Sequence, residues 1–216
     1  MARALRLVSA TARFFDDMAP RYDADLVDLG WDPVQLVRDL LGDVPHNASV
    51  IDAGCGTGAV LAELGGPLRT LTGFDVSPGM VRRARRRQGL RHADLYVADA
   101  GQPWPVDDAS ADVVLAIAML EFVERLDLAL DEVARVLRPG GVALLTVEDV
   151  RDWAGIEREP MELRYNEFPL WRRSADAVEE CIPPGLEVEH ASRVKAYTVL
   201  ERGFTCAYHV RRLRRS

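Results

Sequence analysis

One short segment of the sequence combines residue types that favour ligand binding at a tight turn. Residues 52–58 read Asp-Ala-Gly-Cys-Gly-Thr-Gly and lie between an apolar run and a helical pattern. Glycines allow the backbone to turn sharply and let a ligand approach main-chain N–H groups closely. The spacing of Gly54, Gly56 and Ala59 also satisfies the loose fingerprint of a dinucleotide-binding turn, with Asp75 in the place of its ribose-binding acid. The turn alone therefore leaves two classes of ligand open.

Two further residues distinguish these classes. The Asp52 carboxylate precedes the glycines, where it would repel a pyrophosphate but attract the ammonium group of an amino-acid ligand. Gly58 completes an Asp-x-Gly-x-Gly-x-Gly pattern that the dinucleotide fingerprint does not require. Both features favour a ligand with an amino-acid part over NAD(H).

Further motifs follow in order along the chain. They are Gly-Phe-Asp-Val-Ser-Pro-Gly-Met at 73–80, Val-Ala-Asp-Ala at 97–100, Asp-Val-Val-Leu at 112–115 and Arg-Val-Leu-Arg-Pro-Gly-Gly at 135–141. Upstream, residues 15–23 read Phe-Asp-Asp-Met-Ala-Pro-Arg-Tyr-Asp. Together with the turn at 52–58, these motifs resemble those of the class I S-adenosylmethionine-dependent methyltransferases, and the resemblance covers roughly residues 11–150.

The resemblance implies S-adenosylmethionine as the cofactor. By this resemblance the first motif would wrap the methionine part, Asp75 would accept from both ribose hydroxyls, and Asp99 would accept from the adenine amino group. Met80 would lie near the adenine, and Tyr22 would close over the cofactor. The expected cofactor-binding residues are Tyr22, Asp52, Ala53, Gly54, Cys55, Gly56, Gly58, Asp75, Val76, Met80, Asp99, Ala100 and Ala116.

The candidate catalytic residue is Glu121, which follows the predicted fourth strand. Many relatives carry Leu-Glu-His at this place, and here Phe122 replaces the histidine. We therefore expect neither a histidine base nor the metal site that some quinone O-methyltransferases use there. No cluster of histidine, cysteine and carboxylate with ligand spacing appears elsewhere, so we expect no metal. Glu121 is then either a general base or an amine anchor, or only a carboxylate at a helix start.

Aromatic residues after the predicted fifth strand are candidates for contact with the methyl acceptor. Residues 151–173 are irregular and rich in Trp, Tyr, Glu and Pro, where relatives place a substrate-covering insertion. Tyr165, Phe168 and Trp171 would line an apolar pocket or simply cover the edge of the sheet.

Apolar strand-like runs alternate with helical patterns, which is typical of a parallel sheet covered by helices. The predicted strands are residues 49–53, 70–75, 94–98, 111–116 and 141–146, followed by an antiparallel pair at 186–200 and 203–213. The predicted helices are the N-terminal segment and residues 33–41, 59–64, 77–88, 125–137 and 174–181, with the helix at 125–137 stopping at Pro139-Gly140-Gly141. The fold class is α/β: a Rossmann-like seven-stranded methyltransferase sheet of five parallel strands plus the antiparallel late pair, with helices on both faces.

The length of 216 residues predicts a single domain. Within residues 1–216 we expect an N-terminal helical cap at 1–45 and a cofactor-binding core at 46–150. The substrate-covering insertion would occupy 151–173, and a C-terminal helix and strands would occupy 174–216.

Composition restricts the partners. The net charge of −7 disfavours a nucleic-acid binder, and the arginine clusters at 82–87 and 211–215 are interpreted as a solvated helix face and a basic tail. Apolar runs are too short for a membrane span, and three scattered cysteines favour a reducing, cytoplasmic setting. The expected partner is a small-molecule methyl acceptor, with the chain as a monomer or homodimer.

The sequence thus predicts methyl transfer from S-adenosylmethionine to an O, N or C nucleophile of a small molecule, in bacterial biosynthesis or natural-product tailoring. One alternative is a quinone-type C-methyltransferase, and another is a non-catalytic S-adenosylmethionine-binding protein. An NAD(H)-binding domain is disfavoured by Asp52 and by the small size of the chain.

Overall fold

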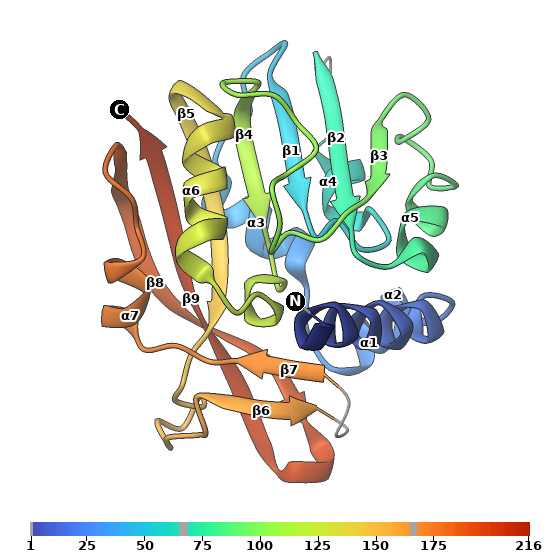
Figure 1. Ribbon diagram of the computed structural model, residues 1–216, viewed down its shortest axis with the longest axis vertical. Coiled ribbons are helices and arrows are strands. Elements are labelled where there is room, and N and C mark those ends of the chain that lie inside the picture. The colour runs from blue at the N-terminus through green and yellow to red at the C-terminus, as the bar shows by residue number, and fades with distance from the viewer. Residues whose placement is uncertain (1, 65–68, 165–167) are drawn as a thin grey trace.

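The computed structural model describes residues 2–64, 69–164 and 168–216, which form a mixed α/β fold (Figure 1). Its helices are α1 (Ala2–Met18), α2 (Tyr22–Asp28), α3 (Pro33–Leu41), α4 (Ala59–Glu63), α5 (Pro78–Ala84), α6 (Leu126–Val136) and α7 (Ala175–Glu180), with the short 3-10 helices η1 (Leu120–Phe122) and η2 (Leu200–Arg202). Its strands are β1 (Ser49–Ala53), β2 (Thr70–Asp75), β3 (Asp94–Val97), β4 (Ala111–Ala116), β5 (Leu137–Glu148), β6 (Met161–Arg164), β7 (Phe168–Trp171), β8 (Leu186–Val199) and β9 (Phe204–Arg215).

Seven strands form one sheet in the order β3-β2-β1-β4-β5-β9-β8. The first five run parallel, while β9 is antiparallel to β5 and β8 is antiparallel to β9. The fold class predicted from the sequence is therefore confirmed. The order reverses on either side of β1, and ligands of open α/β sheets bind outside the carboxyl ends of the strands at such a point.

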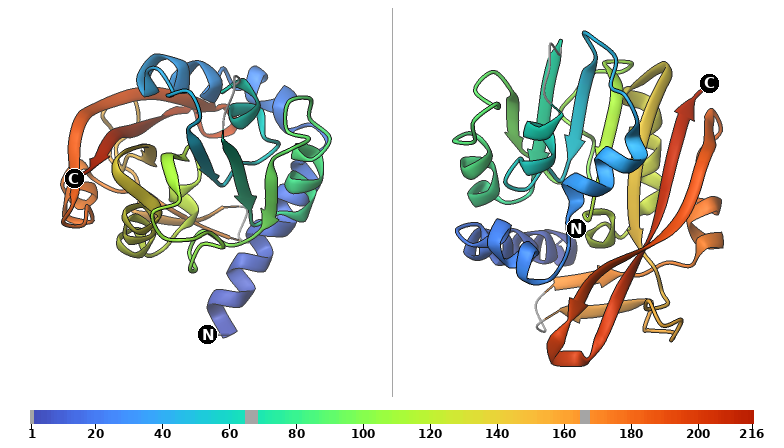
Figure 2. Two further views of the ribbon diagram at one scale, coloured as in Figure 1. Left: turned by 90° about the horizontal axis from the view of Figure 1, so that it is seen from above. Right: turned by 180° about the vertical axis from the view of Figure 1, so that it is seen from behind.

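The two faces of the sheet carry separate apolar cores because alternate residues of a strand point to opposite sides. On one face, Ile51 and Val114 pack with α6 residues such as Leu130. On the other face, Val50 packs with residues of α3, α4 and α5, for example Leu61. Figures 1 and 2 show α6 on the face opposite α3 and α4. Helices thus cover both faces, and the central strand β1 is buried along its whole length.

The N-terminal helices lie across the end of the sheet where the parallel strands finish. Figure 1 shows α1 and α2 below the carboxyl ends of β1, β2 and β3. No helix in the described part of the chain is long and apolar enough to span a membrane.

Three predictions about secondary structure were wrong. Helix α6 ends at Val136, and Pro139-Gly140-Gly141 lies within β5, where the pairing with β4 shifts register. The segment at 151–173, predicted to be irregular, contains the hairpin of β6 and β7. Its strands have four residues each, which is too short for alternation to be visible in the sequence.

The third error concerns the arginines at 211–215, which are part of β9 and not a tail. Arg211 is buried, and its Nε donates to Glu179 Oε1 at 2.7 Å.

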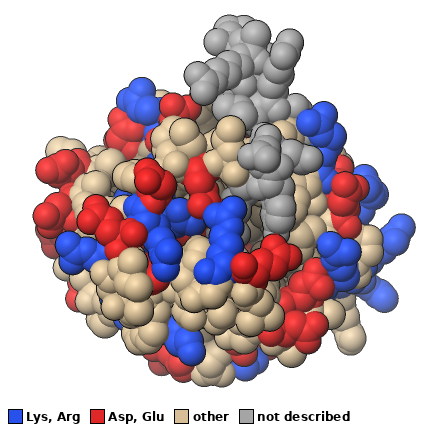
Figure 3. Space-filling model, turned by 90° about the horizontal axis from the view of Figure 1, so that it is seen from below, with Lys and Arg blue, Asp and Glu red and all other residues tan. Residues whose placement is uncertain are grey.

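Figure 3 views the molecule from below, the end where β6 and β7 lie, and shows acidic and basic side chains interspersed there. Two ion pairs at this end join Arg158 to Asp152 and Arg202 to Glu162.

Gly58 at the start of α4 provides a test of the packing around the glycine turn. Its φ is +77°, and an added Cβ would lie 2.5 Å from Leu90 Cδ1 and 3.1 Å from Ala84 Cβ. Gly140 has a similar φ of +79° but nothing within 4 Å, so it isolates the backbone cost of about 1–2 kcal/mol. We expect Gly58→Ala to lower the free energy of unfolding by about 1–3 kcal/mol more than Gly140→Ala, because it adds overpacking. Urea denaturation measures both, and equal losses would contradict this packing.

Candidate active site

The turn between β1 and α4 approaches its neighbours so closely that side chains are excluded. Gly54 has a φ of +71°, and an added Cβ would lie 2.6 Å from Met119 Cβ. The N–H groups of Gly54 and Cys55 donate to the Phe74 carbonyl oxygen at 2.8 and 3.0 Å. The turn is thereby fastened to the end of β2.

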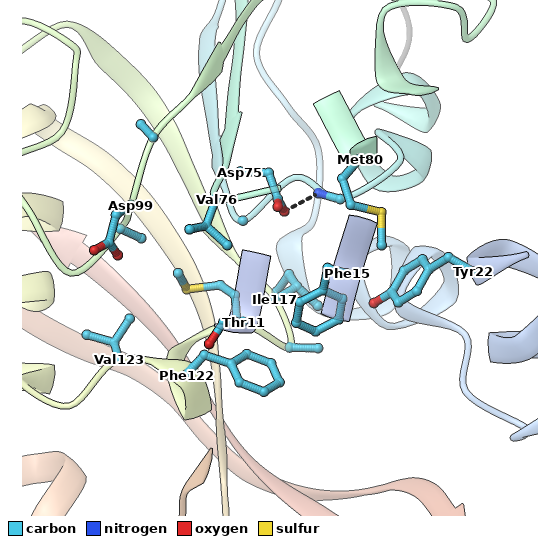
Figure 4. Close-up of a pocket in the computed structure, with 16 residues that line it drawn as sticks. Thr11, Phe15, Tyr22, Asp75, Val76, Met80, Asp99, Ile117, Phe122 and Val123 are labelled. Carbon is cyan, nitrogen blue, oxygen red and sulfur yellow. Dashed lines mark hydrogen bonds between the residues drawn. The ribbon is translucent and has the colours of Figure 1, made fainter. Parts of the chain in front are cut away.

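The Asp75 carboxylate links this turn to the next one. Its Oδ2 accepts from the Gly56 N–H at 2.9 Å (Figure 4), and its Oδ1 accepts from the Ser77 N–H at 2.8 Å. Burial raises the pKa of Asp75 to about 6, while the two backbone hydrogen bonds oppose that rise. The group is therefore a partly desolvated carboxylate with remaining acceptor capacity at neutral pH.

Asp52 lies behind the turn, on β1, and is buried. Burial, followed by the negative charge of Asp75, raises its pKa to about 8. A cation brought near this carboxyl would favour its ionised form. The site thus favours a positively charged ligand group near Asp52.

A cavity opens beside these carboxylates. Figure 4 shows Thr11, Phe15 and Phe122 below Asp75, Val76 and Met80 across this space. The lining residues are Thr11, Phe15, Tyr22, Gly54, Gly56, Asp75, Val76, Met80, Ala98, Asp99, Ala100, Ile117, Ala118, Met119, Phe122 and Val123. We call this space the carboxylate cavity.

Eight of the thirteen residues predicted to bind the cofactor line the carboxylate cavity. They are Tyr22, Gly54, Gly56, Asp75, Val76, Met80, Asp99 and Ala100. The other five, Asp52, Ala53, Cys55, Gly58 and Ala116, are not among its lining residues. Four of those five are in β1, in β4 or in the buried part of the turn, and Gly58 caps α4.

The N-terminal helices are tied to the cavity by two aspartates. Asp16 accepts from Ser77 Oγ at 2.6 Å and from the Gly79 N–H. A side chain at Gly79 would meet Asp16 at 2.6 Å, which explains the glycine there. Asp23 accepts from Thr57 Oγ1 and pairs with Arg87. Each aspartate follows an aromatic residue of the cavity wall, so the ties position those rings.

Arg87 was predicted to belong to a solvated helix face, and the structure gives it this specific place instead. Its Nε donates to the Thr57 carbonyl oxygen at 2.8 Å, inside the glycine turn. The neighbouring arginines 82, 83, 85 and 86 are exposed, as expected.

A second cavity adjoins the first. Eight of its fourteen lining residues are aromatic, and we call it the aromatic cavity. Its lining residues are Phe14, Phe15, Met18, Tyr22, Leu26, Leu29, Trp31, Ala118, Glu121, Phe122, Phe168, Leu170, Tyr197 and Tyr208. Phe15, Tyr22, Ala118 and Phe122 line both cavities. The boundary between the two spaces is therefore made of three rings and one small residue.

Ala118 at this boundary has an unusual backbone conformation. Its φ is +53°, a region that costs a non-glycine residue free energy. The Ala118 N–H donates to Thr146 Oγ1 at 2.7 Å, which helps hold the conformation. Such strained residues cluster at functional sites.

Glu121 lies in the wall of the aromatic cavity and is 2% exposed. The Tyr208 hydroxyl donates to Glu121 Oε1 at 2.6 Å. Phe122, which replaces the expected histidine, packs edge-on against Phe15 with ring centroids 5.3 Å apart. Burial, then the charges of Asp75 and Glu121, raise the pKa of Tyr22 well above its usual value, so its hydroxyl stays protonated.

Of the three predicted acceptor-binding residues, the structure places one in the aromatic cavity. Phe168 is in the aromatic cavity, with its ring centroid 4.8 Å from that of Phe14. Trp171 is on β7 but is not among the lining residues of either cavity. Tyr165 lies outside the described residues.

Among the described residues, no group of three or more histidine, cysteine or acidic side chains is arranged to hold a metal ion. His209 is buried, with Nε2 3.2 Å from Asp149 Oδ1 and 3.1 Å from the Arg173 carbonyl oxygen. These contacts join β9 to the segments after β5 and β7, and none of the three residues lines either cavity.

Several lining residues were not predicted from the sequence. Thr11 and Phe15 come from α1, and Ile117 and Met119 come from the segment after β4. The signal was present for Phe15, which belongs to the motif at 15–23. Ile117 and Met119 are apolar residues that follow an apolar strand. In the sequence they look like ordinary core residues, and only the structure shows that they line the cavity.

The comparisons with known proteins agree with this geometry. Residues 51–145 match a family model described as a methyltransferase domain. The chain is 37% identical over 139 residues to human methyltransferase-like protein 27, covering 62% of this chain and 56% of that protein. It is 34% identical over 151 residues to a demethylmenaquinone methyltransferase of Beutenbergia cavernae, covering 68% and 61%. A malonyl-[acyl-carrier protein] O-methyltransferase of Serratia marcescens is 32% identical, covering 63% and 52%.

The chain thus spans little more than half the length of these curated relatives. Among solved structures, an S-adenosylmethionine-dependent methyltransferase of Mesorhizobium loti has a TM-score of 0.66 at 20% identity, covering 84% of this chain and 96% of that chain. A Thermotoga maritima S-adenosylmethionine-dependent methyltransferase has a TM-score of 0.67 at 18% identity, covering 94% and 99%. These likenesses show the fold. The matching domain at residues 51–145 and the sheet order support a class I S-adenosylmethionine-dependent methyltransferase.

Proposed function

We propose that this chain catalyses methyl transfer from S-adenosylmethionine to a small molecule bound in the aromatic cavity. The observation that carries the proposal is the wall shared by the two cavities at Phe15, Tyr22, Ala118 and Phe122. A methyl donor in the carboxylate cavity and an acceptor in the aromatic cavity would meet at this wall. Methyl-transfer turnover distinguishes this function from that of a non-catalytic binding protein.

The residues of the carboxylate cavity fit the cofactor. Asp75 already accepts two backbone N–H groups, and a carboxylate has further lone pairs for the two ribose hydroxyls. An added Cβ at Gly56 would meet only Tyr22 Cε1, at 3.8 Å, so the turn leaves open space on its cavity side. Asp99 Oδ1 accepts from the Gly101 N–H at 2.9 Å. This hydrogen bond would hold the carboxylate in place to accept from the adenine amino group.

The remaining predicted residues act from behind the turn. Asp52, near Asp75, would favour the ammonium group of the methionine part through charge. Ala53, Cys55, Gly58 and Ala116 would hold the shape of the turn and of the strand beside it.

The bound cofactor supplies a methyl group already activated by its positively charged sulfur. The protein then contributes alignment and exclusion of water. Phe15, Tyr22 and Phe122 would restrict the acceptor to one approach, and Tyr22 would cover the cofactor. Glu121 is the candidate base for acceptors that must lose a proton.

We also propose a setting in small-molecule biosynthesis. The named relatives that act on a quinone precursor and on an acyl-carrier-bound malonyl group support it. A quinone-type C-methyltransferase is the second candidate, favoured by the resemblance to the Beutenbergia cavernae protein.

The first prediction concerns Asp75 and pH. Replacing Asp75 by Ala removes two charge-assisted hydrogen bonds of about 1.5–3 kcal/mol each, so the affinity for S-adenosylhomocysteine should fall at least about a hundredfold. Asp52, whose pKa in the free protein is about 8, should make the affinity rise as the pH approaches 8. Because the free Asp75 carboxyl has a pKa of about 6, the affinity should also decrease as the pH falls through 6. Asp75→Asn should bind weakly without this pH dependence. Calorimetric titration from pH 5 to 8 measures this, and Asp94→Ala, an exposed carboxylate at the start of β3, is the control. If Asp75→Ala bound S-adenosylhomocysteine as tightly as the wild-type chain does, Asp75 would not be the ribose-binding residue.

The second prediction concerns the space at Gly56. A valine there would place its branches where the cofactor must lie, while the protein itself offers no close obstacle. Gly56→Val should therefore abolish detectable binding of S-adenosylhomocysteine while the protein still folds. Gly140→Val is the matched control, because that glycine also has a positive φ but lies outside both cavities. Normal binding by folded Gly56→Val would show that the turn is not the binding surface.

A further inference from the structure

The aromatic cavity has a composition that selects for charge as well as shape. Its rings come from separate parts of the chain, from α1, α2, the loop before α3, η1, β7, β8 and β9. The electron-rich faces of aromatic rings attract cations. A cavity with so many rings therefore favours a flat or apolar ligand, and especially one that carries positive charge.

The charged groups among the described lining residues of both cavities are Asp75, Asp99 and Glu121, and all three are acidic. Glu121 is the one that lies in the aromatic cavity. The Tyr208 hydroxyl donates to Glu121 Oε1, and this hydrogen bond orients the carboxylate. Because Glu121 is 2% exposed, a negative charge on its carboxylate would act on a nearby cation more strongly than it would in solvent.

We propose that the methyl acceptor is an amine with an apolar, preferably aromatic, body. The aromatic rings would bind its body, and the Glu121 carboxylate would bind its ammonium group. This inference rests on the proposed function, since it names the substrate class for the same site. It also predicts that the site disfavours acceptors carrying a carboxylate, because they would bring a second negative charge beside Glu121.

The position of Glu121 gives it a role in the reaction as well as in binding. An ammonium nitrogen has no lone pair to attack with, so it must first lose a proton, and Glu121 would take that proton. The nitrogen lone pair then forms the bond to the methyl carbon as the carbon–sulfur bond breaks. The electron pair of that bond stays on sulfur, the positive charge passes to the methylated nitrogen, and Glu121 later releases its proton to solvent.

The test compares three probes that share one ring system and differ in charge. Naphthylmethylamine is a cation, naphthylmethanol is neutral, and naphthoic acid is an anion at pH 7. Their affinities are measured by calorimetry with the intact chain saturated with S-adenosylhomocysteine. We expect the amine to bind at least tenfold more tightly than the alcohol, and the alcohol more tightly than the acid. Equal affinities, a preference for the acid, or no binding of the amine would overturn the inference.

Two variants test which residues cause the preference for the amine probe. Glu121→Gln should weaken amine binding at least tenfold and leave the alcohol within about twofold, while Glu124→Gln, an exposed carboxylate beside it, should change neither. Phe14→Leu keeps an apolar wall but removes one ring, and it should weaken the amine more than the alcohol. Amine binding that is unchanged in folded Glu121→Gln would also overturn the inference, and the wild-type probe series decides it without any variant.

Affinity for S-adenosylhomocysteine is measured first with the same samples. Its absence in the wild-type chain would refute the proposed function itself. If the wild-type chain bound S-adenosylhomocysteine but did not prefer the amine probe, only the proposed substrate class would be refuted.

Discussion

The site depends on the Asp75 carboxylate at the end of β2. By accepting N–H groups from Gly56 and Ser77, this one side chain fixes the turn after β1 relative to the turn that starts α5. The Phe74 carbonyl oxygen adds two more bonds to the same turn. The carboxyl ends of two neighbouring strands thus become one rigid surface, and a buried charge at its centre is available to a polar ligand. Burial makes that charge costly, as the pKa of about 6 indicates, so a ligand that donates hydrogen bonds to it recovers free energy.

The N-terminal helices complete this surface through a small number of contacts. Asp16 and Asp23 tie α1 and α2 to the segments that Asp75 holds together, and they bring Phe15 and Tyr22 to the boundary between the cavities. The same two rings would therefore contact both proposed ligands. This arrangement joins cofactor binding to the shape of the acceptor site, because the donor and acceptor spaces share their walls.

Much of the fold was predictable because local signals agree with the tertiary structure. The bounds of β1, β2, β4 and α3 follow from apolar runs ended by Gly, Pro or Asp. The predicted sheet of five parallel strands with an antiparallel late pair follows from the resemblance to the family's motifs. The hairpin of β6 and β7 was not predictable, since four-residue strands carry almost no periodicity. The glycine turn was singled out by its residue types and spacing, whereas the roles of Asp75 and Asp99 were predicted from the resemblance to the family's motifs. The aromatic cavity was not, because Trp31, Tyr197 and Tyr208 are far apart in the chain and have no motif of their own. Tyr208 as the partner of Glu121 could come only from the structure.

The most direct measurement is a crystal structure of the chain with S-adenosylhomocysteine. The account predicts the ribose hydroxyls within hydrogen-bonding distance of Asp75, the adenine amino group at Asp99, and the sulfur facing the wall formed by Phe15, Tyr22, Ala118 and Phe122. S-adenosylhomocysteine lying in the aromatic cavity, or with its sulfur directed away from that wall, would contradict the account.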